Sequence, residues 1–250
     1  MTSNQTRAPI RIAMWSGPRN ISTAMMRSFG SRSDCAVTDE PFYGAFLKQT
    51  GIEQPMAAEV IASMDTEWDS VANTVRGPVP GGKALWYQKH MPHHMVGPVS
   101  IADFPDHRHA FLIRDPDAVV ASYAAKRVEI TADDLGYERQ LDYLHHAAQM
   151  TGEAPIVLDS ADILQEPEAQ LKALCRALGI DWDPAMLSWE TGPRDTDGIW
   201  ASHWYNRVLE TDTFATPDNK THILSSAHQR VADECRRFYN RLLEYRLNAF

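Results

Sequence analysis

Short apolar runs alternate with helical patterns along most of the chain. The apolar runs, which predict buried strands, occupy residues 10–15, 84–88, 109–113 and 155–159. The patterns typical of helices occupy residues 22–29, 115–126, 137–150, 167–178 and about 221–247. The last of these carries an apolar stripe of Leu224, Ala227, Val231, Cys235, Phe238 and Leu242. Strands that alternate with helices predict βαβ units and a mostly parallel central sheet flanked by helices, an α/β fold in three layers.

The position of a ligand site follows from this arrangement. Ligands of parallel sheets bind beyond the carboxyl ends of the strands, which are the loops after Trp15, Gln88 and Ile113. Two less regular segments, the irregular helical region 42–76 and the loop-rich region 190–219, are candidates to cover such a site. Because no internal repeat or Gly/Ser linker divides the sequence, we interpret residues 1–250 as one domain.

Composition limits the classes of partner. The chain has 250 residues and a net charge of −9, which argues against a general nucleic-acid binder. An anionic ligand would therefore need a local cluster of cations and backbone N–H groups. Residues 1–9 contain no apolar leader, and no run approaches 18 apolar residues, so neither secretion nor a membrane partner is expected. The distant cysteines Cys35, Cys175 and Cys235 fit neither a disulfide framework nor a zinc pattern, and a cytoplasmic location is the simplest expectation.

The loop after the first strand is a candidate anion site. It runs through Ser16-Gly17-Pro18-Arg19-Asn20-Ile21-Ser22-Thr23 into a predicted helix. The free N–H groups and positive end of such a helix bind phosphate or sulfate, and Arg19 adds a fixed charge. The alternative is an ordinary turn with an Asn or Ser helix cap. The loop is not a Walker A motif, because it lacks the second glycine and the lysine.

Residues 18–23 resemble the P-R-S-G-T-T loop of sulfotransferases that use 3′-phosphoadenosine 5′-phosphosulfate (PAPS). Pro18, Arg19 and Thr23 match, Ser22 is a conservative exchange, and Asn20 and Ile21 replace the usual Ser and Gly. Ile21 removes backbone freedom from the loop. The resemblance implies that the loop binds the 5′-phosphosulfate through these residues: Gly17, Pro18, Arg19, Asn20, Ile21, Ser22 and Thr23.

A second segment, residues 111–123, resembles the strand–loop–helix motif R-[ND]-P-x-D/A-V-x-x-S-Y of the same family. The resemblance implies that Arg114 and Ser122 bind the 3′-phosphate of the nucleotide. An Arg at the end of a buried strand is well placed for that role. The alternative is that Arg114 and Asp115 form a pair that caps a helix, with Ser122 on the surface.

The order of the family's segments continues toward the C-terminus. Residues 156–167 and 171–180 are similar to the family's V-x-Y-E-D-L-x-x-x-P and L-G-[IL] segments, which are structural. The family's C-terminal R-K-G segment, which holds the 3′-phosphate, has no counterpart here. Arg194 and Arg207 are candidates to replace it.

Two residues are candidates for the base that deprotonates the acceptor. Residues 88–92 resemble the family's K-T-H-x-P, which implies that His90 is the general base, with Gln88 in place of the Lys and Lys89 one position later. The alternative for His90 is a structural or metal cluster with His93 and His94.

Glu40, in the sequence Asp39-Glu40-Pro41, is the second candidate, and it could equally bind the acceptor. The alternative there is a helix cap, with Asp39 as the capping residue and Pro41 at the first helical position.

The resemblance implies a P-loop-like fold and transfer of a sulfuryl group from PAPS to a hydroxyl or amine of a small-molecule acceptor. In-line transfer would leave the product nucleotide, 3′-phosphoadenosine 5′-phosphate (PAP), and no metal is expected to take part. Two other functions stay open at this point, an ATP-dependent kinase or phosphotransferase and a non-catalytic nucleotide-binding protein. The acceptor and the oligomeric state are open as well.

Overall fold

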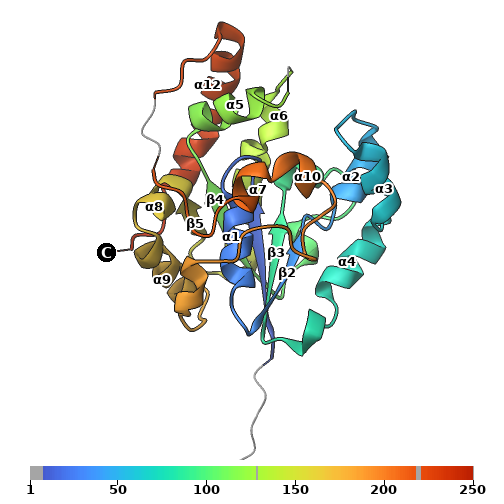
Figure 1. Cartoon of the computed structure of the whole chain (residues 1–250), viewed down its shortest axis with the longest axis vertical. Coiled ribbons are helices and arrows are strands. Elements are labelled where there is room, and N and C mark those ends of the chain that lie inside the picture. The colour runs from blue at the N-terminus through green and yellow to red at the C-terminus, as the bar shows by residue number, and fades with distance from the viewer. Residues whose placement is uncertain (1–7, 128, 218–220, 250) are drawn as a thin grey trace, which may run out of the picture.

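The computed structural model describes residues 8–127, 129–217 and 221–249. Residues 1–7 of the N-terminal segment 1–9, and residues 218–219 of the loop-rich region 190–219, lie outside the described residues. Within the described residues, five strands form one sheet in which every neighbouring pair is parallel: β1 (Ile10–Ser16), β2 (Cys35–Asp39), β3 (Leu85–His90), β4 (His107–Ile113) and β5 (Ile156–Asp159). Their order is β2-β3-β1-β4-β5 (Figure 1).

The register of the sheet sets the position of the loops. Trp15 of β1 pairs with His90 of β3 on one side and with Phe111 of β4 on the other. The carboxyl ends of the three central strands therefore lie at the same edge, and so do the loops that follow them. This confirms the predicted α/β fold with a parallel central sheet.

The helices connect and cover the strands. The α-helices are α1 (Ser22–Gly30), α2 (Tyr43–Thr50), α3 (Ala57–Ser63), α4 (Trp68–Arg76), α5 (Pro116–Ala124), α6 (Ala132–Leu135), α7 (Tyr137–Thr151), α8 (Ser160–Gln165), α9 (Pro167–Ala177), α10 (Ala201–Trp204), α11 (Asn206–Leu209) and α12 (Ser226–Leu243). Short 3-10 helices occupy Pro80–Gly82, Pro92–His94, Ile101–Asp103 and Pro184–Leu187. In the part of the chain that the structure describes, no helix is both long and apolar enough to span a membrane.

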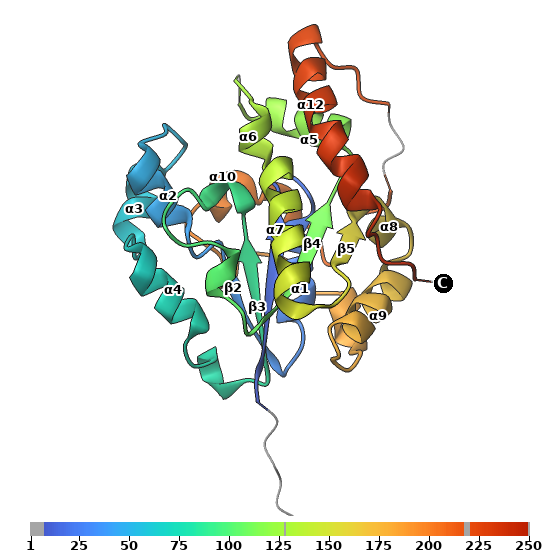
Figure 2. The same cartoon turned by 180° about the vertical axis from the view of Figure 1, so that it is seen from behind.

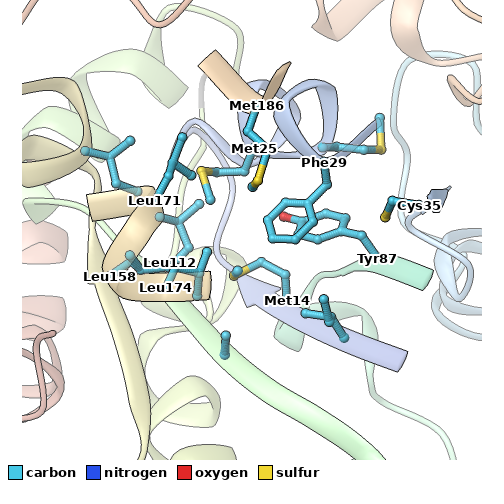
Figure 3. Close-up of a cluster of buried hydrophobic side chains, with 14 of the residues drawn as sticks. Met14, Met25, Phe29, Cys35, Tyr87, Leu112, Leu158, Leu171, Leu174 and Met186 are labelled. Atoms are coloured by element: carbon cyan, nitrogen blue, oxygen red, sulfur yellow. The ribbon is translucent and has the colours of Figure 1, made fainter. Parts of the chain in front are cut away.

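Two apolar clusters pack against opposite faces of the sheet. On one face, α1 and α9 cover β1, β4 and β5, and the cluster includes Met14, Met25, Phe29, Leu171 and Leu174 (Figure 3). On the other face lie α4, α5, α7 and α12, with α7 crossing the sheet in the rear view (Figure 2). Successive side chains of a strand point to opposite faces of the sheet, so Met14 of β1 belongs to the first cluster and Trp15 to the second.

The structure adds short helices that the pattern did not predict, among them α6 and α8, and it differs from the predicted elements at β2 and at the start of the last helix. The pattern did not predict β2, which is a five-residue edge strand with only its two ends buried, so it lacks a continuous apolar run. The last helix begins at Ser226, where the side chain of Ser225 caps it, rather than near 221. Leu224 therefore precedes the helix, and Ala227 is exposed rather than part of the buried stripe. The region 42–76 forms α2, α3 and α4, separated by irregular turns, as expected.

Candidate active site

A cavity of about 760 Å³ lies where the loops after β1, β3 and β4 meet. Its volume is in the range of small-molecule and cofactor pockets, about 300–1,000 Å³. Of the residues singled out from the sequence, the lining contains Pro18, Arg19, Asn20, Ile21, Ser22, Thr23, Glu40, Arg114 and Ser122. Gly17 and His90 are not part of it. The topology therefore brings most of the predicted residues to one place.

The crossing segment, residues 190–217, forms another wall of this cavity. It passes over the α1 side of the sheet and is drawn in orange in Figure 1. Trp200, Trp204, Tyr205 and Arg207 line the cavity from this segment, and Tyr43 lines it from α2. Both irregular regions of the sequence thus contribute to the lining.

The first turn of α1 faces the cavity with its backbone donors uncapped. The helix begins at Ser22 and no side chain caps it, so its first N–H groups are available to an anion. Arg19 and Ile21 hold φ angles of 64° and 58°, in the left-handed region that disfavours side chains other than glycine. Such a conformation costs about 1–3 kcal/mol and persists where surrounding contacts impose it, often at functional sites. Ile21 takes this conformation where the resembled motif has glycine.

Buried polar contacts hold the loop from below. Asn20 donates from Nδ2 to the carbonyl of Leu112 at 3.2 Å. Gln140 of α7 donates from Nε2 to the carbonyls of Trp15 and Leu112, both at 3.0 Å. Gln140 was not predicted, because nothing in its local sequence shows that it reaches the ends of two strands. Its contacts fix the loop before any ligand binds.

Gly17 has a packing role that is visible only in the structure. A Cβ atom at this position would lie 2.5 Å from the carbonyl oxygen of Leu135, much closer than real Cβ contacts. The glycine therefore allows the loop to approach the end of α6. Its predicted role as a residue that contacts a nucleotide stays a prediction.

Arginine side chains gather around the first loop. Arg19 donates from Nε to Oγ of Ser122 at 2.9 Å, and Arg114 donates from Nη1 to the carbonyl of Arg19 at 2.8 Å. Arg207 lines the same cavity. Burial, with the positive charges of Arg114 and Arg207, lowers the pKa of Arg19. Among the described residues no carboxylate pairs with Arg19, so its guanidinium retains positive charge for an anion.

The alternative in which Arg114 and Asp115 pair with each other to cap a helix is wrong about the partner of Asp115. Asp115 does cap α5, through the N–H groups of Asp117 and Ala118. Its ion pair, however, is with Arg236 of α12, at 2.7 Å. Ser122 lies on the cavity side of α5 rather than on the outer surface.

A buried ionic cluster also contributes to the lining of the cavity, through Glu40, Lys89 and Tyr205. It consists of Asp39, Glu40, Lys89 and Tyr205, each at most 9% exposed. Lys89 Nζ lies 2.9 Å from Asp39 Oδ1, 2.7 Å from Glu40 Oε1 and 2.6 Å from the Tyr205 hydroxyl. That hydroxyl donates to Asp39 Oδ2 at 2.6 Å. The cluster links β2, β3 and the crossing segment at the cavity.

The charges in this cluster depend on each other. Burial by itself lowers the pKa of Lys89, but the carboxylates of Asp39 and Glu40 outweigh burial and hold that pKa well above its usual value. Burial, followed by the charge of Asp39, raises the pKa of Tyr205, which stays a neutral donor. Lys89 is therefore an ammonium ion near neutral pH. Of the residues in this cluster, only Lys89 could have been placed on the cavity side from the alternation of side chains along a strand.

The structure decides between the alternatives for Asp39 and Glu40. Helix α2 begins at Tyr43, two residues after Pro41, and no side chain caps it. The Asp39 carboxylate bonds to Lys89, Tyr205 and the N–H of Gly198 instead. The helix-cap interpretation is therefore wrong, and Glu40 lines the cavity.

His90 lies on the other face of the sheet, so the structure does not support it as the base. Its ring stacks on Trp15 with centroids 4.7 Å apart, and its Nε2 lies 3.1 Å from Gln88 Oε1. Burial lowers the pKa of His90 well below its usual value. Residues of β3 alternate, so Lys89 faces the cavity and Gln88 and His90 face away from it.

The histidine cluster considered as a metal site is divided between the two faces. His93 and His94 line the cavity, but His90 does not. In the described residues, no group of three His, Cys, Asp or Glu side chains could hold a metal ion. The expectation that no metal takes part stays a prediction.

Comparison with known proteins identifies the family. The family model described as "Sulfotransferase domain" matches residues 10–242. The chain belongs to the sulfotransferase family. Two solved structures share the sulfotransferase fold with it: a sulfotransferase from Alicyclobacillus acidocaldarius, with a TM-score of 0.56, 10% identity and coverage of 95% of each chain, and the sulfotransferase domain from the curacin biosynthetic pathway, with a TM-score of 0.51, 14% identity and coverage of 92% of this chain and 98% of that one.

The sulfotransferase-family chain also matches two curated relatives from Arabidopsis thaliana. Branched-chain-amino-acid aminotransferase-like protein 2 is 32% identical over 230 residues, which are 92% of this chain and 40% of that protein. Protein 1 of the same name is 32% identical over 233 residues, 93% of this chain and 41% of that protein. The chain thus spans about two fifths of the length of these relatives.

Proposed function

We propose that the protein transfers a sulfuryl group from PAPS to a hydroxyl or amine of a small-molecule acceptor, without a metal ion. The observation that carries the proposal is that a cluster of cations and a carboxylate line the same cavity. Arg19, Arg114 and Arg207 line it together with the uncapped start of α1, as an anionic nucleotide requires. Glu40, which lines the same cavity, offers a carboxylate oxygen that can accept a proton.

The nucleotide would bind beside these arginines. Arg19 and the first N–H groups of α1 would hold the 5′-phosphosulfate, and Arg114 and Ser122 the 3′-phosphate. Support for this assignment is that Arg19 and Ser122, 103 positions apart in sequence, are already hydrogen-bonded across the site. Arg207 supplies a cation from the C-terminal part of the chain, where the family's R-K-G segment has no counterpart.

The transfer would proceed in line. The acceptor oxygen or nitrogen forms a bond to sulfur while the bond from sulfur to the phosphate oxygen breaks, and PAP leaves. Negative charge grows on that bridging oxygen, where the guanidinium of Arg19 and the fixed N–H groups of α1 would stabilise it. The acceptor's proton would pass to Oε2 of Glu40, a residue that lines the cavity and whose other oxygen is bonded to Lys89. Because a sulfuryl group carries less charge than a phosphoryl group, these cations suffice without Mg²⁺.

The first test is thermal stabilisation by PAP without Mg²⁺, measured beside ATP with Mg²⁺. A ligand at about 100 times its Kd adds about 2.7 kcal/mol of stability. For a domain of this size that is a rise of about 5–10 °C in Tm. We expect PAP to produce this rise and PAPS to be consumed when an acceptor is present.

A rise with Mg²⁺–ATP and none with PAP would contradict the proposal and favour the kinase alternative. A rise with PAP, but no consumption of PAPS over a broad panel of alcohols and amines, would favour a non-catalytic nucleotide-binding protein. Replacing Arg114 with Ala provides the matched check, since that variant should lose the response to PAP.

A further inference from the structure

The ionic cluster leaves one oxygen of Glu40 open toward the cavity. Lys89 has three N–H donors, and Asp39, Glu40 and Tyr205 accept all of them. Both oxygens of Asp39 are also bonded, Oδ2 to the Tyr205 hydroxyl and the N–H of Gly198. Among the described residues nothing donates to Glu40 Oε2. Nδ1 of His94 lies 3.8 Å from this oxygen, beyond hydrogen-bond distance.

The charge of the cluster is also incomplete. Two carboxyl groups, Asp39 and Glu40, share one ammonium ion, and all three side chains are at most 10% exposed. Burial, together with the charge of Glu40, raises the pKa of Asp39 although Lys89 opposes this, so the ammonium ion does not fully compensate the pair. His94 supplies no compensating charge, because burial lowers its pKa well below the usual value. A buried negative charge that lacks a partner is costly, and a cation that approaches Oε2 removes that cost.

Aromatic side chains also line the cavity. Tyr43 and Trp200 line it and meet edge to face, with ring centroids 5.1 Å apart. Tyr205 already holds a cation over its ring, Nζ of Lys89 at 4.8 Å from the centroid. Ring faces of this kind attract ammonium groups and exclude water. The lining of the cavity therefore holds this ionic cluster and aromatic rings as well as the arginines.

We propose that the acceptor is a primary alkylamine, which enters as its ammonium ion and binds Oε2 of Glu40. This inference rests on the proposed function, and it selects the amine from the two acceptor classes named there. Both the charge of the cluster and its open hydrogen-bond acceptor match a cationic N–H donor. Glu40 Oε2 then positions the nucleophile and receives its proton.

The step balances as follows. The ammonium ion gives one proton to Glu40 Oε2, which frees the nitrogen lone pair. The nitrogen forms a bond to sulfur while the bond from sulfur to the phosphate oxygen of PAPS breaks, and PAP leaves with that electron pair. The nitrogen loses a second proton to water, so the product is a sulfamate.

Proton affinity favours the amine as well. An alkylammonium ion, like the lysine side chain, has a pKa of about 10.4, whereas water, the model for a simple hydroxyl, has a pKa of about 15.7. A carboxylate is a weak base, so it removes a proton from an ammonium ion far more readily than from an alcohol. Of the two carboxylates in the cluster, Glu40 is the one that lines the cavity. Lys89 cannot act as a base, because it is protonated and donates to three acceptors.

Matched ligands test the inference. Benzylamine and benzyl alcohol have similar shapes and differ in charge, and each is titrated calorimetrically into the protein with and without saturating PAP. We expect benzylamine to bind about tenfold or more tightly than benzyl alcohol, since hydrogen bonds to charged groups are the stronger class. Glu40→Gln should abolish this preference. Glu168→Gln, which neutralises an exposed carboxylate on α9, should keep it.

Equal binding of the two ligands by the wild-type protein would overturn the inference. So would a preference for benzylamine that survives in Glu40→Gln, provided that this variant still binds PAP and is therefore folded. If Glu40→Gln does not fold, the comparison of the two ligands in the wild-type protein decides by itself. Failure of PAP to bind, with benzylamine still preferred, would contradict the proposed function and leave the cation subsite standing.

Discussion

At the scale of single residues, the site depends on side chains that reach across the fold. Arg19 is fixed by Ser122 of α5, and its own carbonyl is fixed by Arg114. One contact from a distant segment therefore orients the guanidinium, and the other holds the backbone of the strained loop that carries it. A group that is held in place before the reaction stabilises developing charge without a cost of reorganisation.

Replacing Arg19 with Ala tests this role. We expect kcat to fall about 100-fold or more, because the guanidinium would act on charge that develops in the transition state. Steady-state kinetics with PAPS and a working acceptor measure the effect, and stabilisation by PAP checks that the variant still binds nucleotide. An unchanged kcat with a raised KM for PAPS would assign Arg19 to ground-state binding only.

At the scale of elements, the crossing segment is anchored to α1 by a buried ion pair. Arg27 Nη2 lies 2.6 Å from Asp197 Oδ2, and the two side chains are 1% and 4% exposed. The segment then continues to Trp200, which donates to the Tyr205 hydroxyl, and to Tyr205, which donates to Asp39. The anchor therefore supports the wall of the cavity that carries the ionic cluster.

Removing one partner of this pair should destabilise the protein strongly. Asp197→Ala leaves Arg27 charged and buried, at a cost of about 3–5 kcal/mol in the free energy of unfolding. Glu67→Ala is the matched control, because Glu67 and Lys48 form a pair whose side chains are 73% and 53% exposed, and the loss of that pair should cost less than about 1 kcal/mol. Urea denaturation measures both variants. Similar losses in the two would show that the Arg27 pair does not anchor the segment.

At the scale of the whole molecule, the sheet separates two environments. The face under α1 leads to the charged cavity, whereas the opposite face buries histidines in an apolar layer. His109 accepts from Trp15 Nε1 at 3.1 Å, and its Nε2 bonds the carbonyl of Phe104 at 3.0 Å. Burial lowers the pKa of His107 and of His109 to about 4, so both rings are neutral in the folded protein near pH 7.

This layer predicts how stability depends on pH. Between about pH 6.5 and pH 4 the unfolded chain binds protons that the folded His107 and His109 do not, so the free energy of unfolding falls as pH decreases through this window. Each ring accounts for up to about 3 kcal/mol of that loss. Urea denaturation at pH 7.5, 5.5 and 4.5 measures it. His109→Gln, which cannot titrate, should show a smaller slope, and an unchanged slope would exclude this ring as a source.

The elements and the sheet could be predicted largely from local sequence. Apolar runs show buried strands, and periodic stretches show helices, because the two structures expose side chains with different periods. Edge strand β2 was missed, since an edge strand is only partly buried and needs no continuous apolar run. The predicted start of the last helix was about one turn too early, because the capping residue Ser225, not the apolar pattern, determines where α12 begins.

By itself, the sequence determined the fold and the nearness of Arg114 to the first loop, and it predicted an anion site there, since the strands and the position of each motif follow from neighbouring residues. Tertiary structure decided which side chains meet in the cavity. It placed His90 on the other face of the sheet and brought Lys89, Glu40 and Tyr205 together. Lys89 and Tyr205 are 116 positions apart in the sequence. A shift of one residue along a strand reverses the face on which a side chain lies. Contacts between distant segments leave no local pattern, so only packing of the whole chain defines them.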